Sequence, residues 1–281
     1  MTEFLAFFVP WEFSWLVQIS VWSALLLYFN GLRNTPAGEL PGYGPILGFV
    51  LGVVLMYLVT QTHFDYWSQY MFFIHRGQHL VLHHLAPFLI ALAMPAPVLA
   101  RGIPPRVRAW FARQGWLRAV WVVPYRWLQQ PAIACFLFVG LIAFWLTPEI
   151  HFDAMLSLTL YWVMNWSMAL DGLLFWWLMF DRGKSGITPR LGYGTRVLLL
   201  FAVMVPQIII GASITFADSN WFEVYAVCGR AWPLDPMTDQ HLGGLITWIP
   251  AAMMSVVGAL VILRFWIYDD AARNAARPAA A

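Results

Sequence analysis

Seven apolar stretches, each long enough to cross a lipid bilayer, constrain the fold of this chain more than any other feature. A helix rises about 1.5 Å per residue, so about 20 residues cross the ~30 Å hydrocarbon layer. The stretches are residues 11–30, 42–62, 80–100, 131–149, 155–179, 196–217 and 243–267. We therefore predict an all-α fold, a single membrane domain over residues 1–281 with seven transmembrane helices.

Composition excludes a water-soluble domain. Of the 281 residues, 61% are hydrophobic and 11% are charged, whereas soluble domains carry about 25% charged residues. The net charge of +2 is too near balance to indicate nucleic-acid binding. Two cysteines exclude a disulfide framework and a cysteine-only metal cluster.

The basic residues predict how the chain is oriented, because short loops rich in Lys and Arg stay in the cytoplasm. One set of helix ends carries Arg33, Arg101, Arg106, Arg108, Arg113, Arg118, Arg126, Arg182, Lys184, Arg190, Arg196, Arg264, Arg273 and Arg277. The other set carries only Arg76 and Arg230. With seven spans, this division predicts an external N-terminus and a cytoplasmic C-terminus.

Three segments outside the spans have a recognisable character. Residues 101–130 are predicted to be a cytoplasmic interfacial segment, in which residues 105–127 mix Arg with Trp as an amphipathic helix on the bilayer would. Residues 64–73 suit a short helix in the outer headgroup layer. The Ala-rich residues 274–281 are expected to be a flexible tail. The first residues lack the basic and cleavage features of a signal peptide, so none is expected.

All seven histidines fall on the predicted outer side. They are His63, His75, His79, His83, His84, His151 and His241. The spacing i, i+4, i+8 predicts that His75, His79 and His83 lie along one helix face. Two imidazoles at i and i+4 can chelate one transition metal ion, because their Cβ atoms are about 5 to 6 Å apart.

This pattern predicts a metal site on the outer side. The main candidate ligands are His75, His79, His83 and His241, and the weaker candidates are His63, His84, His151, Cys228 and Met71. The two sulfur-bearing residues would supply the soft ligand that Cu(I) prefers. The residues leave three other interpretations open: histidines that only hydrogen-bond headgroups or loops, a proton relay, and a haem site.

Several charged residues near or within the spans need partners. Asp171 lies near the middle of the fifth span, where a carboxylate requires a partner such as Asn165 or a group on another span. The outer residues Arg76 and Arg230 are expected to pair with an aspartate, for which the candidates are Asp65, Asp153 and Asp239; the alternative is that they bind an anionic group. Asp239 is also suited to capping the last span, and two glycines after it, at 243 and 244, would allow a neighbouring helix to approach closely.

Two motifs resemble those of a known family. Residues 75–79 read His-Arg-Gly-Gln-His, with Pro87 beyond them and Met-Pro-Ala-Pro at 94–97. This resembles the HMxQH, APxLL and GxP signature of the CtaG family of cytochrome c oxidase assembly factors. Residues 239–250 are similar to that family's DQxxGGxxMWxP entry to the last span, and residues 173–177 read LLFWW as the family's fifth span does.

The chain departs from the family pattern at positions where the family carries histidine. Residues 145–148 read Trp-Leu-Thr-Pro where the family has Trp-His before a proline, and a histidine follows at His151 instead. Residues 161–165 read Tyr-Trp-Val-Met-Asn where the family has HxxEH. The resemblance, which covers roughly residues 40–268, implies the fold, whereas three of the family's candidate ligand positions lack histidine in this chain.

Together these observations lead to an expected function. The resemblance implies a protein of a bacterial inner membrane that is an assembly factor for a haem-copper oxidase and binds copper, as Cu(I), on its outer, periplasmic side. It would pass the ion to an oxidase subunit or to another copper chaperone. No nucleotide-binding loop or nucleophile with a paired base is evident, so we expect no enzyme activity. A haem-binding membrane cytochrome and a metal or proton transporter acting through Asp171 are the alternatives.

Overall fold

A computed structural model describes residues 7–181 and 188–275, without the side chains of residues 117–119, and contains no strand within these ranges. The helices that follow one another along the chain are α2 (Trp15–Arg33), the short η1 (Ala37–Glu39), α3 (Tyr43–Gln61), α4 (His63–Tyr70), α5 (Phe72–His79), the π-helix η2 (Leu80–Leu85), α6 (Ala86–Leu92), α7 (Ala96–Gly102), α8 (Pro105–Arg113), α9 (Gly115–Leu128), α10 (Pro131–Trp145), α11 (Pro148–Leu156), α12 (Leu158–Phe180), α13 (Tyr193–Thr215), α14 (Val224–Val227) and α15 (Pro236–Ala275).

The predicted all-α membrane fold is confirmed. The helices α2, α3, α12, α13 and α15 are each long and apolar enough to cross a membrane. Two further candidates are bent by 77° each: Phe72–Leu92 with α7, and Val120–Leu128 with α10. The described residues therefore hold five to seven candidate spans, and the predicted seven is the upper value. The predicted orientation of the termini remains a prediction.

Some helix bounds differ from the predicted spans. The helical segment of the third candidate span begins at Phe72, eight residues before the predicted start at 80, and its first polar residues are buried. Residues 105–127 form two helices that meet at Gln114, where one amphipathic helix was expected. The last candidate span is part of a 40-residue helix that ends at Ala275, so the first two residues of the predicted tail are helical. The rest of the predicted tail, which includes Arg277, lies outside the described residues, as do Arg182 and Lys184.

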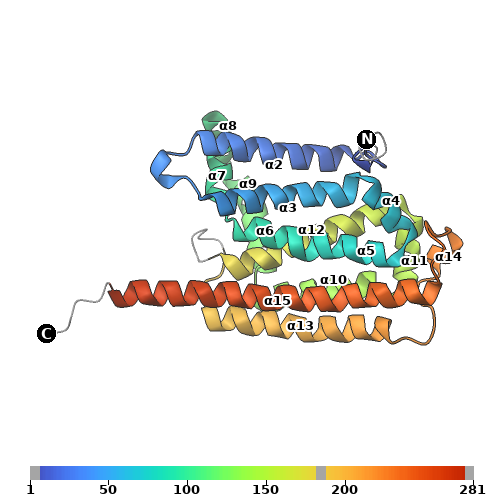
Figure 1. The fold of residues 1–281 in the computed structure, drawn as a ribbon. Coiled ribbons are helices and arrows are strands. Elements are labelled where there is room, and N and C mark those ends of the chain that lie inside the picture. Colours follow the sequence, from blue (N-terminus) through green and yellow to red (C-terminus); the bar gives the residue numbers. More distant parts are fainter. Residues whose placement is uncertain (1–6, 182–187, 276–281) are drawn as a thin grey trace.

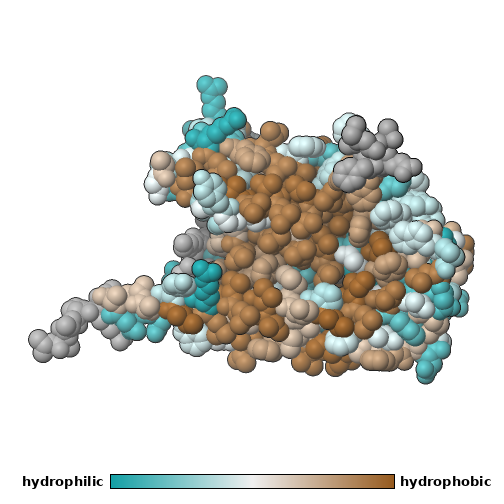
Figure 2. Space-filling model, in the orientation of Figure 1, coloured by the Kyte–Doolittle hydropathy of each residue, from teal (hydrophilic) through white to brown (hydrophobic). Residues whose placement is uncertain are grey.

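The long helices lie side by side and roughly parallel, with short helices at both ends of the bundle (Figure 1). The helices α4, α11 and α14 gather at one end, where α15 begins. The helices α7 and α8 lie toward the opposite end, beyond which α15 extends. Hydrophobic residues cover the middle of the face seen in Figure 2, and hydrophilic residues gather toward the two ends, as expected of a bundle that crosses a bilayer.

The most buried long helix is α12, and aromatic side chains pack around it. Phe175 stacks on Phe138 of α10 with ring centroids 3.8 Å apart, and Trp176 is fully buried beside them. Such large rings bury much apolar surface, so they fix α12 at the centre of the bundle. The histidine-bearing helices α5 and η2 pack against α12 and α15.

A buried histidine pair as candidate metal centre

Two histidines on successive turns of α5 form the centre of the candidate site. The ring centroids of His75 and His79 lie 4.4 Å apart, and the two side chains are 0% and 1% exposed. None of their four ring nitrogens makes a hydrogen bond of normal length and angle within the described residues, although the amide of Asn165 lies near His79. Buried polar atoms without partners are costly and uncommon in proteins, so this pair has spare capacity to bind a ligand.

A third imidazole reaches the pair from another helix. His151 of α11 lies with its ring centroid 5.1 Å from that of His75. Its Nδ1 is 3.0 Å from the carbonyl oxygen of Trp145, and its Nε2 is 3.0 Å from the hydroxyl of Tyr225. Since a carbonyl only accepts, Nδ1 carries the proton and Nε2 accepts from the tyrosine. Burial and the charge of Arg76 lower the pKa of His151 to about 3, so this ring is neutral.

The helix that carries the pair is held at its N-terminus by the last span. Asp239 of α15 accepts hydrogen bonds from the backbone amides of Phe72 (3.1 Å) and Phe73 (2.9 Å), and it also pairs with Arg230. Asp239 therefore caps α5, and the prediction that it caps its own helix was wrong. An aspartate suits this place because the first amides of a helix have no partner within the helix. The predicted pairing of Arg230 with an aspartate is confirmed.

Two glycines let α15 approach its neighbours, as predicted. A Cβ on Gly243 would lie 2.3 Å from the ring of Phe72, and one on Gly244 would lie 2.5 Å from the hydroxyl of Thr215. A larger residue at either position would therefore push α15 away from α5 or α13.

A buried carboxylate on α4 organises a hydrogen-bond network beside the site, and the sequence did not predict it. Asp65 accepts hydrogen bonds from the hydroxyl of Tyr161 (2.7 Å) and from the amides of Gln78 (2.8 Å) and Gln69 (3.0 Å). Burial raises the pKa of Asp65 to about 7. The ring of Tyr161 lies 6.2 Å from that of His75, so the network adjoins the pair. A single aspartate in a short helix carries no sequence signal of this role.

The two deeper histidines have other partners. Nε2 of His83 lies 3.0 Å from a carboxylate oxygen of Asp171, and Nε2 of His84 lies 3.4 Å from the amide oxygen of Gln207. The expectation that Asp171 has a partner is confirmed, and that partner is His83. Because these residues belong to a π-helix, whose turns are wider than those of an α-helix, they do not simply extend the face that carries the pair.

Arg76 is the buried cation of this region. Arg76 is 4% exposed, and its Nε donates a hydrogen bond to the hydroxyl of Thr247 at 3.0 Å. The expected aspartate partner is not found for it within the part of the chain that the structure describes. Arg76 borders a cavity of about 10 Å³ together with His79, His83 and His84. That volume holds about one water molecule, and it does not accommodate a haem.

The remaining candidate ligands lie apart from the pair. The Nε2 of His241 is 3.3 Å from the carbonyl oxygen of Ala217, and His63 packs between Trp11 and Tyr66. Met71 is buried at the junction before α5, and Cys228 is exposed after α14. Among the described residues, no group of three or more His, Cys, Asp or Glu side chains is arranged to hold a metal ion. The structure thus brings together His75 and His79, with His151 beside them.

Two of the three positions where the family carries histidine and this chain does not lie beside the pair. The ring of Tyr161 lies 6.2 Å from that of His75, and Asn165, one turn further along α12, lies beside His79. Both are buried. The third position, Leu146, is buried at the end of α10.

The fold and the site define a multi-span helical membrane protein with a buried polar centre built on histidine. The sequence profile of the cytochrome c oxidase caa3 assembly factors, Caa3_CtaG, matches residues 26–269. The chain belongs to this family.

The curated relatives add little about activity. The chain is 27% identical over 282 residues to an uncharacterized protein of Mycobacterium leprae, covering 94% of this chain and 40% of that protein. It is also 27% identical over 244 residues to uncharacterized proteins of Mycobacterium bovis and Mycobacterium tuberculosis, covering 81% of this chain and 34% of each. The chain thus spans well under half the length of these relatives. No solved structure matches it.

Proposed function

We propose that this protein supports the assembly of a caa3-type cytochrome c oxidase by binding Cu(I) at His75 and His79 and passing the ion to an oxidase subunit or to another copper chaperone. The observation that carries the proposal is the contact between two buried imidazoles whose four nitrogens make no hydrogen bond of normal length and angle within the described residues. Imidazole nitrogen is a good ligand for copper, and a neutral ring is the form that binds a metal ion.

The surroundings of the pair favour a monovalent ion. Arg76 lies on the same helix between the two histidines, and the coulombic repulsion of a bound cation grows with the charge of that cation. Cu(I) therefore suffers less repulsion than Zn²⁺ or Cu²⁺ would. A site with two histidines also leaves coordination positions open, which an ion that is handed on requires.

The remaining parts of the site have supporting roles in this proposal. His151 is the nearest further imidazole, and its Nε2 becomes available if the hydroxyl of Tyr225 turns away. The cap from Asp239 fixes the start of α5 and so the position of His75. The predicted orientation places this end of the bundle on the periplasmic side of the inner membrane.

The test is a competition titration of the purified protein with a Cu(I) chelator. We expect His75→Ala and His79→Ala to weaken Cu(I) binding by about 10- to 100-fold, by analogy with the loss of groups that support a metal site. The matched control is His63→Ala, at a histidine that lies apart from the pair, and it should leave the affinity unchanged. His83→Ala and His151→Ala are expected to have smaller effects than the first two.

Each variant is checked for folding by its thermal unfolding midpoint. Equal affinity in the wild type and the two pair variants, or an equal loss in all variants, would contradict the assignment of the pair as the ligand core.

The cellular role is tested by deleting the gene. The copper content and activity of a caa3-type oxidase should fall, haem synthesis should stay intact, and added copper should restore part of the activity. Normal oxidase activity under copper limitation would contradict the role in copper delivery.

A further inference from the structure

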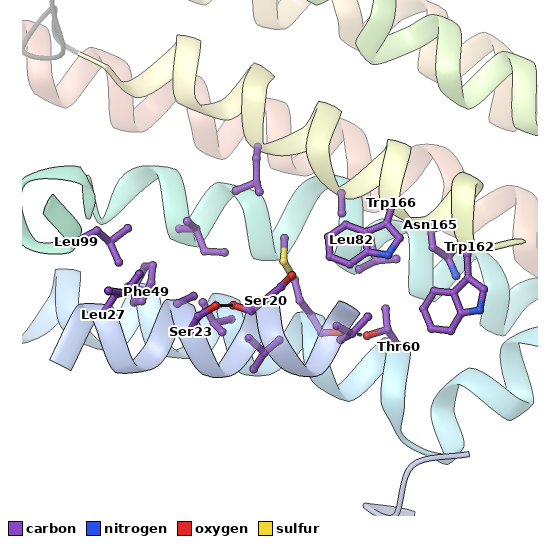
Figure 3. A pocket seen from close by; sticks show the side chains of 18 of the residues that line it. Ser20, Ser23, Leu27, Phe49, Thr60, Leu82, Leu99, Trp162, Asn165 and Trp166 are labelled. Carbon is purple, nitrogen blue, oxygen red and sulfur yellow. Dashed lines mark hydrogen bonds between the residues drawn. The ribbon is translucent and has the colours of Figure 1, made fainter. Parts of the chain in front are cut away.

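A second, apolar cavity lies on the other side of α12, between α2, α3, α6 and the end of α7. Its volume is about 420 Å³, within the range of small-molecule pockets. Figure 3 shows that it is elongated: Leu27 and Leu99 lie toward one end, and Thr60, Trp162 and Asn165 lie toward the other. Such a shape suits a ligand with a chain and a distinct head.

Among the described residues that line this cavity, one buried polar side chain makes no hydrogen bond of normal length and angle. Asn165 is 3% exposed, and both atoms of its amide are in this state, although the amide lies near His79 and Tyr161. In contrast, the hydroxyl of Thr60 donates to the backbone of Met56 at 2.7 Å, and that of Ser23 donates to the backbone of Ile19. The amide is therefore the group in the cavity wall that a ligand would satisfy.

The rest of the wall restricts the chemistry of the ligand. Among the residues that the structure describes, no Lys, Arg, Asp or Glu side chain lines the cavity, so a charged headgroup such as a phosphate or carboxylate would be buried without a counter-charge from them. Trp162 and Trp166 line the cavity on either side of Asn165 along α12 (Figure 3), and indole faces favour contact with a planar ring. A neutral planar head with a carbonyl oxygen fits this end.

The opposite part of the cavity fits a single apolar chain. The cavity as a whole follows α2 from Val17 to Leu27, which corresponds to about 15 Å of helix, so the chain would occupy the part toward Leu27. The lining on α2 consists of Val, Ala and Leu with two serines, and α3, α6 and α7 add Phe, Val, Met, Ile and Leu.

We propose that this cavity binds a prenylated quinone, with the ring beside Trp162 and Trp166, a ring carbonyl accepting a hydrogen bond from the amide of Asn165, and the chain extending toward Leu27 and Leu99. The proposal rests on the cavity and not on copper binding, although Asn165 lies beside His79 as well.

The test is calorimetric titration of the detergent-solubilised full chain with a benzoquinone that carries a ten-carbon chain. We expect one site per chain. Asn165→Leu should weaken binding about tenfold, as the loss of one buried hydrogen bond does. Ala24→Phe, which fills the cavity from α2, should abolish binding. The matched control is Leu26→Phe on the same helix, whose side chain is exposed and does not line the cavity.

Three outcomes would overturn the proposal: no saturable binding to the wild type, unchanged binding to Ala24→Phe, or equally tight binding of a ten-carbon alcohol that has no ring. The last result would indicate a site for acyl chains. Ser20→Leu is a second cavity-filling variant if Ala24→Phe does not fold. A Cu(I) titration of the filled variant should match the wild type, so failure of this proposal and failure of copper binding are distinguishable.

Discussion

Buried polar side chains with specific partners distinguish this bundle from a purely apolar one. Three buried aspartates have three different partners. Asp65 accepts hydrogen bonds from side-chain amides and a hydroxyl, Asp171 contacts an imidazole, and Asp239 caps a helix. A buried group of this kind stabilises the fold only while its partner is present. Removing single partners should therefore have large and local effects.

Asp65 should make stability depend on pH. Its pKa is raised to about 7 in the folded protein from an ordinary value near 3.8. The folded state therefore holds a proton that the unfolded state has lost between these values, and stability should fall as pH rises from about 4 to about 7. Asp65→Asn keeps the acceptor for Tyr161 and cannot ionise.

The measurement is the thermal unfolding midpoint in detergent from pH 4.5 to 8, compared between the wild type and Asp65→Asn. The difference between the two should change across this window and level off above pH 7. Parallel curves would mean that Asp65 keeps an ordinary pKa when folded.

Asp171→Ala should destabilise the protein by about 1 to 3 kcal/mol, because it leaves Nε2 of His83 buried without a partner. Asp171→Asn, which retains an acceptor, should cost less. The control is Asp153→Ala, at an exposed position on α11. Chemical unfolding in detergent measures all three, and equal midpoints for the two alanine variants would show that the contact contributes nothing.

Among the elements, η2 and α12 depend most closely on each other. A Cβ on Gly172 of α12 would lie 2.3 Å from the carbonyl oxygen of His83. The residue that precedes this glycine, Asp171, contacts the ring of the same histidine. The contact between the two helices therefore needs both a small residue and a carboxylate on one turn of α12.

Gly172→Ala should destabilise the protein by about 1 to 3 kcal/mol through overpacking, since backbone on the partner helix must move. Gly140→Ala on α10 is the matched control, because a Cβ there meets only the edge of Phe136 at 3.9 Å. It should be neutral or slightly stabilising, as alanine favours helix more than glycine does. The measurement is the unfolding midpoint of each variant relative to the wild type. An unchanged midpoint for Gly172→Ala would contradict the prediction, because it would mean that the two helices can separate at no cost.

For the whole molecule, the bundle has two different ends. The described part of α15 finishes at the end opposite to the one where α2 begins (Figure 1), which agrees with an odd number of crossings. The histidine pair lies on α5, near the end that carries α4, α11 and α14. Whether the proposed copper site lies on the periplasmic side thus depends on which end of the bundle faces outward.

Reporter fusions test this orientation. The excess of Arg and Lys at one set of helix ends predicts a cytoplasmic reporter after Arg113 and an external one after Asp153. An external signal after Arg113 would reverse the bundle and place the histidine pair on the cytoplasmic side.

The sequence by itself determined the class of fold, because apolar stretches of membrane length allow only helices when the backbone has no water to bond. It also predicted the pairing of His75 with His79, since an i, i+4 spacing is a local property of one helix. The close approach allowed by the glycines at 243 and 244 was likewise predictable from residue size.

Only the tertiary structure decided which distant residues meet. Three contacts in and around the site join residues far apart in the chain. They are His151 with His75, Asp171 with His83, and Asp239 with the first amides of α5. Sequence spacing holds no information on such contacts, because they depend on how helices pack and on local changes of helix type. The π-helix at Leu80–Leu85 directs His83 toward α12 and His84 toward α13. Bends after Leu92 and Leu128 divide two of the candidate spans. Hydrophobic periodicity in the sequence predicts neither feature.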